Sequence, residues 1–226
     1  MRKQVSITYM MLSMLFTVSL ITANIVGQKL ISFHGLILTA SIFIFPITYI
    51  VNNLIAEVWG YRRMRLTIWS GFLFNFLVCI VFRLSIWFPA STNYISQQSF
   101  TLILHAAERL TIASFIAFLL GSFINAYVMS KMKIWQHGRH FAGRAIISTV
   151  VGEGTDSLVF FTIAFSGILH RHALILLILG QATIKIAFEV LVLPLTNYVV
   201  KNLKKYEHSD VFDNRISYNP FKIKDV

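Results

Sequence analysis

Six long apolar segments constrain this chain more than any other feature of its sequence. They cover residues 7–27, 36–58, 66–88, 109–130, 145–167 and 173–199. An α-helix needs about twenty apolar residues to cross a hydrocarbon core about 30 Å thick, and each segment is near or above that length. Over the whole chain, 56% of the residues are hydrophobic and 13% are charged, which excludes an ordinary soluble domain. We therefore predict an all-α integral membrane protein with six transmembrane helices.

Basic residues gather at alternate ends of these segments. Three lie in one set of connections, Lys29, Arg109 and Arg171, and fifteen lie in the other set. The fifteen are Arg2, Lys3, Arg62, Arg63, Arg65, Lys131, Lys133, Arg139, Arg144, Lys201, Lys204, Lys205, Arg215, Lys222 and Lys224. Because cytoplasmic loops are enriched in Lys and Arg, this asymmetry predicts a cytoplasmic N-terminus and a cytoplasmic C-terminus. The same placement accounts for the net charge of +11, so no nucleic acid is predicted as a partner.

The domain organisation follows the same pattern. Residues 1–205 form one predicted six-helix transmembrane domain, in which the first apolar segment is a retained helix because it is too long for a signal peptide and lacks an A-x-A site. Residues 206–226 mix charges with turn-forming residues, and we predict a mobile cytoplasmic tail there. The connection over 89–107 is predicted to be a solvated external loop, with a lid as the alternative.

Two acids lie deep inside the fifth segment. At about 1.5 Å of helical rise per residue, Asp156 lies roughly 18 Å from Arg144, close to the bilayer centre. Thr149, Glu153 and Asp156 have the spacing i, i+4, i+7, which puts them on one face of a helix. An ionisable residue inside a membrane helix commonly marks a functional site. We predict that this seam faces a cavity; the alternative is that structural partners neutralise both acids.

Two other segments carry polar residues at one-turn intervals. These are Tyr49, Asn53 and Glu57 in the second segment, and Gln181, Lys185 and Glu189 in the sixth. By the same helical rise, Lys185 lies about 18 Å from the external end of its segment and so at nearly the depth of Asp156. The sequence leaves two partners open for Lys185: Asp156 on the fifth helix, or Glu189 one turn away on the same helix.

Glycines and helix ends give two further expectations. Gly152 and Gly154 flank Glu153, and they could either let another helix approach closely or let the backbone open toward a ligand. Glu57 lies at the predicted cytoplasmic end of its helix, beside the basic residues 62–65, where a surface ion pair is expected.

The polar residues of these segments form the candidate substrate site. The candidates are Glu153, Asp156, Lys185, Asn75, Thr149, Asn24, Gln181, Glu189, Tyr49 and Asn53. No catalytic residue, cofactor or metal ligand is predicted. The chain has no G-x-S-x-G, H-E-x-x-H or Walker A motif, so we predict neither an enzyme nor an ATPase.

Five stretches together match the motifs of one known family. They are ITANIVGQK (21–29), NNLIAEVWGYRRMR (52–65), ERLTIASFIAFLLGSFINAYVMSKMK (108–133), STVVGEGTDSLVFFTIAF (148–165) and KIAFEVLVLPLTNYVVKNLKK (185–205). The chain resembles the VUT or YhhQ-like transporters of queuosine precursors, which are small six-helix membrane proteins. Two residues depart from the family pattern: Asn53 stands at a position that is often Asp, and Asn125 at one that can also be Asp.

The resemblance implies a multi-pass protein of the bacterial inner membrane that imports a 7-deazapurine for tRNA modification. The substrate would be 7-cyano-7-deazaguanine or its aminomethyl relative, 7-aminomethyl-7-deazaguanine. A guanine-like edge presents two N–H groups side by side, and the carboxylate of Glu153 or Asp156 can accept both. The flat heterocycle could also stack on an aromatic ring. The aromatic candidates are Phe45, Tyr49, Trp69, Phe160 and Phe161.

Two other functions stay open from the sequence. A six-helix chain with a basic cytoplasmic face is also compatible with the substrate-binding subunit of an energy-coupled vitamin transporter. An intramembrane enzyme fits less well because the motifs named above are absent from the sequence. The expected partners are the small-molecule substrate and the lipid bilayer, and a homo-oligomer stays open.

Overall fold

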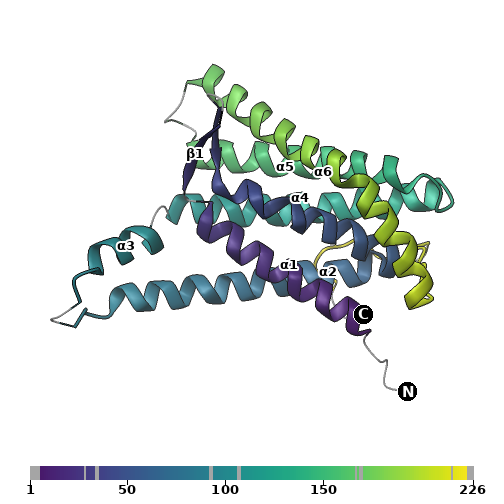
Figure 1. The fold of residues 1–226 in the computed structure, drawn as a ribbon, viewed down its shortest axis with the longest axis horizontal. Helices are drawn as coiled ribbons and strands as arrows, with labels where there is room; N and C mark the ends of the chain where they lie inside the picture. Colours follow the sequence, from purple (N-terminus) through teal and green to yellow (C-terminus); the bar gives the residue numbers. More distant parts are fainter. Residues whose placement is uncertain are drawn as a thin grey trace.

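Long helices make up most of the fold in the computed structural model (Figure 1). The structure describes residues 6–27, 29–33, 36–91, 94–105, 108–165, 167, 170–214 and 216–222. The elements are α1 (Ile7–Val26), β1 (Leu30–Phe33), β2 (Leu36–Thr39), η1 (Ala40–Phe43), α2 (Phe45–Trp87), α3 (Gln97–His105), α4 (Glu108–Trp135), α5 (Phe141–Phe165) and α6 (Arg171–Glu207). Five of the helices are long and apolar enough to cross a membrane, α1, α2, α4, α5 and α6. The prediction of a helical integral membrane protein is confirmed at this level.

Helix α2 reverses its direction at Gly60. This glycine has φ 82° and ψ 172°, a backbone conformation that is essentially restricted to glycine. The two halves of α2 run in opposite directions on either side of it (Figure 1). The backbone N–H of Tyr61, next to the break, donates a hydrogen bond of 2.8 Å to Asp213 Oδ2. The predicted second and third helices are thus joined by a sharp break at one residue rather than by a loop.

Two predicted boundaries differ from the structure. Residues 36–44, predicted as the start of a helix, form β2 and η1, and β2 pairs antiparallel with β1 so that Leu30 lies opposite Thr39. Helix α2 begins only at Phe45, where Pro46 in the first turn needs no hydrogen-bond acceptor for its backbone nitrogen. The predicted external loop over 89–107 contains α3. Short runs next to a long apolar segment carry too little periodicity to show these elements.

The connections that carry the predicted cytoplasmic charges share one end of the bundle. The break in α2, the α4–α5 connection and the end of α6 lie at that end, and the β1–β2 hairpin and α3 lie at the other (Figure 1). Four of the fifteen basic residues, Arg2, Lys3, Arg215 and Lys224, lie outside the described residues.

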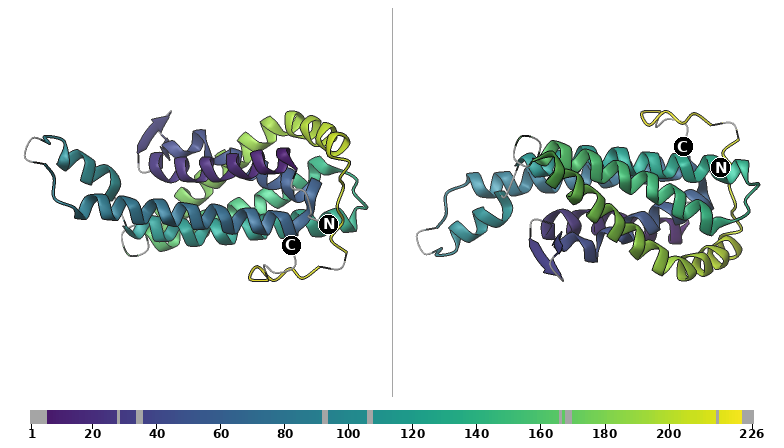
Figure 2. Two further views of the ribbon diagram at one scale, coloured as in Figure 1. Left: turned by 90° about the horizontal axis from the view of Figure 1, so that it is seen from below. Right: turned by 90° about the horizontal axis from the view of Figure 1, so that it is seen from above.

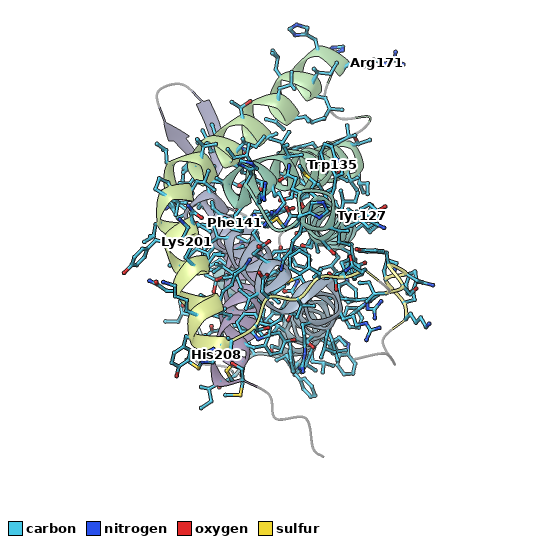
Figure 3. The ribbon with its side chains drawn as sticks, turned by 90° about the vertical axis from the view of Figure 1, so that its right-hand side faces the viewer. Tyr127, Trp135, Phe141, Arg171, Lys201 and His208 are labelled. Carbon is cyan, nitrogen blue, oxygen red and sulfur yellow. The ribbon has the colours of Figure 1, made fainter. Side chains whose placement is uncertain are left out.

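Helices α2, α4 and α5 form the centre of the bundle. Helix α1 packs on α2, and α6 packs on α5 and α2. Figure 2 shows α1 and the long half of α2 running along each other, and Figure 3 shows α6 crossing the outside of the bundle from Arg171 past Lys201 to His208. Large apolar side chains such as Leu73, Phe74 and Leu191 are exposed on the outer faces. This distribution suits helices surrounded by lipid.

Helices α4 and α5 approach each other closely at Gly121 and Gly152. A Cβ atom at Gly152 would lie 2.8 Å from the Cβ of Asn125 and 3.0 Å from the carbonyl oxygen of Gly121. A Cβ atom at Gly154 would meet nothing within 4 Å. Of the two glycines that flank Glu153, Gly152 is therefore the one that lets a second helix approach.

We expect Gly152→Ala to destabilise the protein by about 1 to 3 kcal/mol, because the added methyl group overpacks the α4–α5 contact. Gly154→Ala is the matched control, and it should be neutral or slightly stabilising because Ala favours a helix over Gly by about 1 kcal/mol. Thermal unfolding of both variants in detergent gives the comparison. Equal destabilisation by the two substitutions would contradict this packing.

Residues 208–222 pack on the bundle where they are described, whereas the sequence predicted a mobile tail. Asp213 is buried and accepts hydrogen bonds from the Tyr61 backbone N–H and the Ser130 hydroxyl, at 2.8 and 2.5 Å. Arg65 Nη1 donates to two tail carbonyl groups, at 3.0 and 2.9 Å. The tail stays on the bundle because it supplies acceptors for donors that the break in α2 leaves buried.

Candidate functional site

Three layers of polar residues lie along one face of the first half of α2. Tyr49, Asn53 and Glu57 follow one another at intervals of about 6 Å, one helical turn each, and all three are buried. Each layer includes residues from other helices. We call the layers the charged centre, the amide cluster and the basic cluster, and we define each by its residues below.

The charged centre consists of Phe45, Tyr49, Glu153, Asp156 and Lys185. Lys185 Nζ lies 2.9 Å from Glu153 Oε2 and 2.9 Å from Asp156 Oδ2. The same atom lies 4.1 Å from the centroid of the Phe45 ring, a cation–π contact. One lysine on α6 thus compensates two acids on α5, and the buried charges stabilise one another. The structure contains the interhelical pair with Asp156 that the sequence left open, and it adds Glu153.

The charged centre holds polar atoms without hydrogen-bond partners. Among the described residues, neither the Tyr49 hydroxyl nor Glu153 Oε2 makes a hydrogen bond, although the latter is in ionic contact with Lys185. A Cβ atom at Gly121 would lie 2.6 Å from the Tyr49 hydroxyl and 2.9 Å from the Cβ of Asp156, so both side chains lie close to this glycine. Buried polar atoms are normally paired, so this unused capacity is what a polar ligand would satisfy.

The amide cluster consists of Asn53, Asn125, Ser148, Thr149 and Glu189. The amide nitrogen of Asn53 donates to Glu189 Oε1 at 2.7 Å, and the Thr149 hydroxyl donates to Glu189 Oε2 at 2.6 Å. The amide oxygen of Asn53 accepts from Asn125 Nδ2 at 3.0 Å and from the Ser148 hydroxyl at 3.2 Å. All five side chains are buried. The cluster therefore links α2, α4, α5 and α6 through neutral donors and one acid.

The basic cluster consists of Glu57, Lys133, Arg144, Lys204 and Asp210. Glu57 pairs with Arg144 at 2.7 Å and with Lys204 at 2.5 Å, and Lys133 lies 3.9 Å from it. Asp210 in the tail pairs with Lys133 and Lys204, at 2.5 and 2.9 Å. Partial burial works to raise the pKa of Asp210, but hydrogen bonds from these two lysines outweigh it and lower the pKa below its ordinary value.

The predicted surface ion pair of Glu57 is wrong. Glu57 is fully buried, and its partners come from α4, α5 and α6 rather than from residues 62–65. The break at Gly60 separates these basic residues from the inner face of α2, so closeness in sequence does not bring them to Glu57.

The remaining candidates lie outside these clusters. Asn24 accepts a hydrogen bond of 2.6 Å from the Ser114 hydroxyl. Asn75 and Gln181 are buried, and the described hydrogen bonds do not join either of them to the three layers. Reasoning from the sequence missed Ser148 and read Lys133, Arg144 and Lys204 only as charges at helix ends. The available signal was the spacing of Arg144 and Ser148, which lie one turn apart on the same helix as Thr149 and Glu153.

The aromatic candidates divide among three places. Phe45 and Tyr49 lie at the charged centre, whereas Phe160 and Phe161 pack on each other with ring centroids 5.0 Å apart. Trp69 lines a separate cavity of about 440 Å³ between α2, α4 and the tail. Among the described residues, no carboxylate or amide side chain lines that cavity, so no side-chain carboxylate is present there to accept two N–H groups of a purine edge together.

Comparison with known proteins places the chain in a family. A family model described as "Putative vitamin uptake transporter" matches residues 39–199. The chain belongs to this vitamin uptake transporter family. It is 24% identical over 190 residues to a Bacillus subtilis (strain 168) protein named "Probable queuosine precursor transporter", covering 84% of this chain and 83% of that protein. It is also 24% identical over 161 residues to the "Queuosine precursor transporter" of Escherichia coli (strain K12), covering 68% and 67%. No solved structure matches the chain.

The family match confirms the resemblance and covers two of the three layers. All residues of the charged centre and the amide cluster lie within 39–199. In the basic cluster, Lys204 and Asp210 lie beyond the range that matches the vitamin uptake transporter family. The part of the chain shared with the family therefore carries the two layers at membrane depth.

Proposed function

We propose that this protein imports a queuosine precursor, 7-cyano-7-deazaguanine or 7-aminomethyl-7-deazaguanine, across the bacterial inner membrane for tRNA modification. The names of the two relatives support the substrate class. The observation that carries the proposal is the charged centre, where two acids and one lysine meet inside an apolar bundle beside an unpaired Tyr49 hydroxyl. We assign the protein a transport role and no catalytic one.

The charged centre suits the polar edge of a 7-deazaguanine. Lys185 can keep its contact with Asp156 while the Glu153 carboxylate turns to the substrate and accepts its ring N–H and its exocyclic N–H together. The Tyr49 hydroxyl is a donor for the ring carbonyl oxygen, and the Phe45 ring is a flat surface for the heterocycle. An aminomethyl substituent carries a positive charge, which a centre with two acids tolerates.

The other predicted residues receive supporting roles in this proposal. Thr149, Asn53 and Glu189 hold the amide cluster one turn below the substrate. Asn24 is half-buried on α1, and Asn75 and Gln181 are buried on α2 and α6. We propose that these three polar residues line the substrate's path.

We also propose six membrane crossings with cytoplasmic termini. The reversal at Gly60 supports two crossings within α2, and the basic connections share one end of the bundle. A reporter enzyme that works only in the cytoplasm should be active when it is fused after Val226. Activity only of a reporter that works on the external side would reverse the topology.

Uptake in cells tests the function. In a strain that cannot synthesise queuosine precursors, expression of this protein should give saturable uptake of radiolabelled 7-cyano-7-deazaguanine. The aminomethyl analogue should compete for uptake, and a panel of vitamins should not. Absence of uptake of both precursors, with the protein present in the membrane, would refute the proposal. Uptake of a vitamin that depends on an added ATPase module would favour the energy-coupled alternative.

A further inference from the structure

Glu189 is the buried acid that the charged centre does not explain. Its side chain is 3% exposed, and its carboxylate accepts from the Asn53 amide at 2.7 Å and the Thr149 hydroxyl at 2.6 Å. Both donors are neutral. In the part of the chain that the structure describes, the ion pairs give Glu189 no basic partner.

The other charged groups that face this region are already paired. On α5, Glu153 and Asp156 share Lys185, whose ammonium group lies 2.9 Å from each of them and forms no ion pair with Glu189 among the described residues, although Lys185 and Glu189 lie one turn apart on α6. On α2, Glu57 pairs with Arg144 and Lys204, and the neighbouring Tyr49 carries a neutral hydroxyl. An isolated carboxylate in an apolar interior is costly, and it becomes neutral by taking up a proton.

The amide cluster is arranged to hold Glu189 in either protonation state. The Asn53 amide is oriented by two donors to its oxygen, Asn125 Nδ2 at 3.0 Å and the Ser148 hydroxyl at 3.2 Å, so it turns its own N–H to Glu189. The Asn125 amide oxygen is buried and, among the described residues, has no donor. A spare buried acceptor in the same cluster can accept a hydrogen bond from a protonated group after a side-chain rotation.

The amide cluster is close enough to the charged centre to affect it. Asn53, Thr149 and Glu189 lie about 6 Å, one turn, from Tyr49, Glu153 and Lys185, respectively. With Glu189 ionised, the three acids and one lysine of the two layers carry a net charge of −2, and a proton on Glu189 reduces it to −1. Charges about 6 Å apart interact strongly where water is excluded.

From this arrangement we propose that Glu189 binds the coupling proton of the transporter. The proton comes from external water, forms an O–H bond with the Glu189 carboxylate, and leaves to the cytoplasm when that bond breaks. The substrate meanwhile occupies the charged centre, so the two ligands use different carboxylates. This inference rests on the proposed transport function, and it adds the driving ion and the residue that carries it.

Two measurements test the role of Glu189, and the first needs no substrate. Infrared spectra of the purified protein should show the C=O stretch of a protonated carboxyl group that disappears at alkaline pH. The band should be lost in Glu189→Gln and kept in Glu207→Gln, a matched control at the C-terminal end of α6. A wild-type spectrum with no such band, or a band unchanged by Glu189→Gln, would overturn the proposal even if the substrate assignment were also wrong.

The second measurement follows 7-cyano-7-deazaguanine in proteoliposomes. With one proton per neutral substrate, an inward gradient of one pH unit supports about tenfold accumulation, because one unit is a tenfold ratio of proton concentrations. Glu189→Gln, which resembles the protonated acid, should lose this accumulation and keep exchange of labelled for unlabelled substrate. Proton-driven accumulation by Glu189→Gln, or wild-type accumulation that follows a Na⁺ gradient instead, would overturn the proposal. A wild type that neither binds nor exchanges the substrate would refute the transport function, while the infrared result still decides the proton site.

Discussion

Lys185→Met is expected to destabilise the protein and abolish transport, because it leaves Glu153 and Asp156 side by side without a counter-charge. Breaking a buried ion pair by removing one partner typically costs about 3 to 5 kcal/mol. The acids can recover part of this cost by taking up a proton, since burial favours the neutral form. Asp156→Asn should cost less, because Lys185 keeps Glu153 as a partner.

A double-mutant cycle on thermal stability measures the interaction between Asp156 and Lys185 apart from the other effects of each substitution. We expect Asp156→Asn and Lys185→Met to couple by roughly 0.5 to 3 kcal/mol, as residues in contact do. Lys201→Met, an exposed lysine on the same helix, is the control and should change stability by less than about 0.5 kcal/mol. Coupling near zero between positions 156 and 185 would contradict the charged centre.

Glu57→Gln is expected to have a destabilising effect of the same order. Glu57 is the common acid for Arg144 and Lys204, and Arg144 and Lys133 are almost completely buried beside it. Asp210 remains as a partner for Lys133 and Lys204, but Arg144 has no other acid among the described ion pairs. The loss of one buried partner again corresponds to about 3 to 5 kcal/mol.

The measurement for Glu57→Gln is thermal unfolding at low and high salt. The loss of stability should hardly depend on ionic strength, because salt screens exposed pairs far more than buried ones. Glu207→Gln is the matched control and should be nearly neutral. A surface pair between Glu57 and residues 62–65 predicts the opposite result, a small effect that salt removes.

The membrane class and the depth of the polar seam could be predicted from the sequence for a simple physical reason. Apolar length and helical rise are local properties, and they are sufficient to put Asp156 and Lys185 at similar depth. The pairing of Lys185 with two acids was not predictable, because it depends on how α6 rotates against α5. The Gly121–Gly152 contact that brings α4 against α5 could not be predicted from the spacing of residues in the sequence either.

Two features at the end of the bundle that carries the basic connections have a common physical cause. A single glycine with positive φ breaks α2 and turns its second half back, so the inner face of the first half ends at Glu57. That geometry gathers Arg144, Lys204 and the tail around one acid, through contacts between residues far apart in sequence. Polar tail residues look mobile by composition, yet Asp213 and two tail carbonyl groups find buried donors there.

Equilibrium binding of radiolabelled 7-cyano-7-deazaguanine to the purified protein tests the central claim most directly. We predict saturable binding to the wild type and to the control Glu207→Gln, and binding weakened roughly 10- to 100-fold in Glu153→Gln, since a hydrogen bond to a charged group contributes about 1.5 to 3 kcal/mol. Glu153→Gln should remain folded, because Lys185 keeps Asp156. Wild-type affinity in a folded Glu153→Gln variant, or no binding to the folded wild type, would contradict the account.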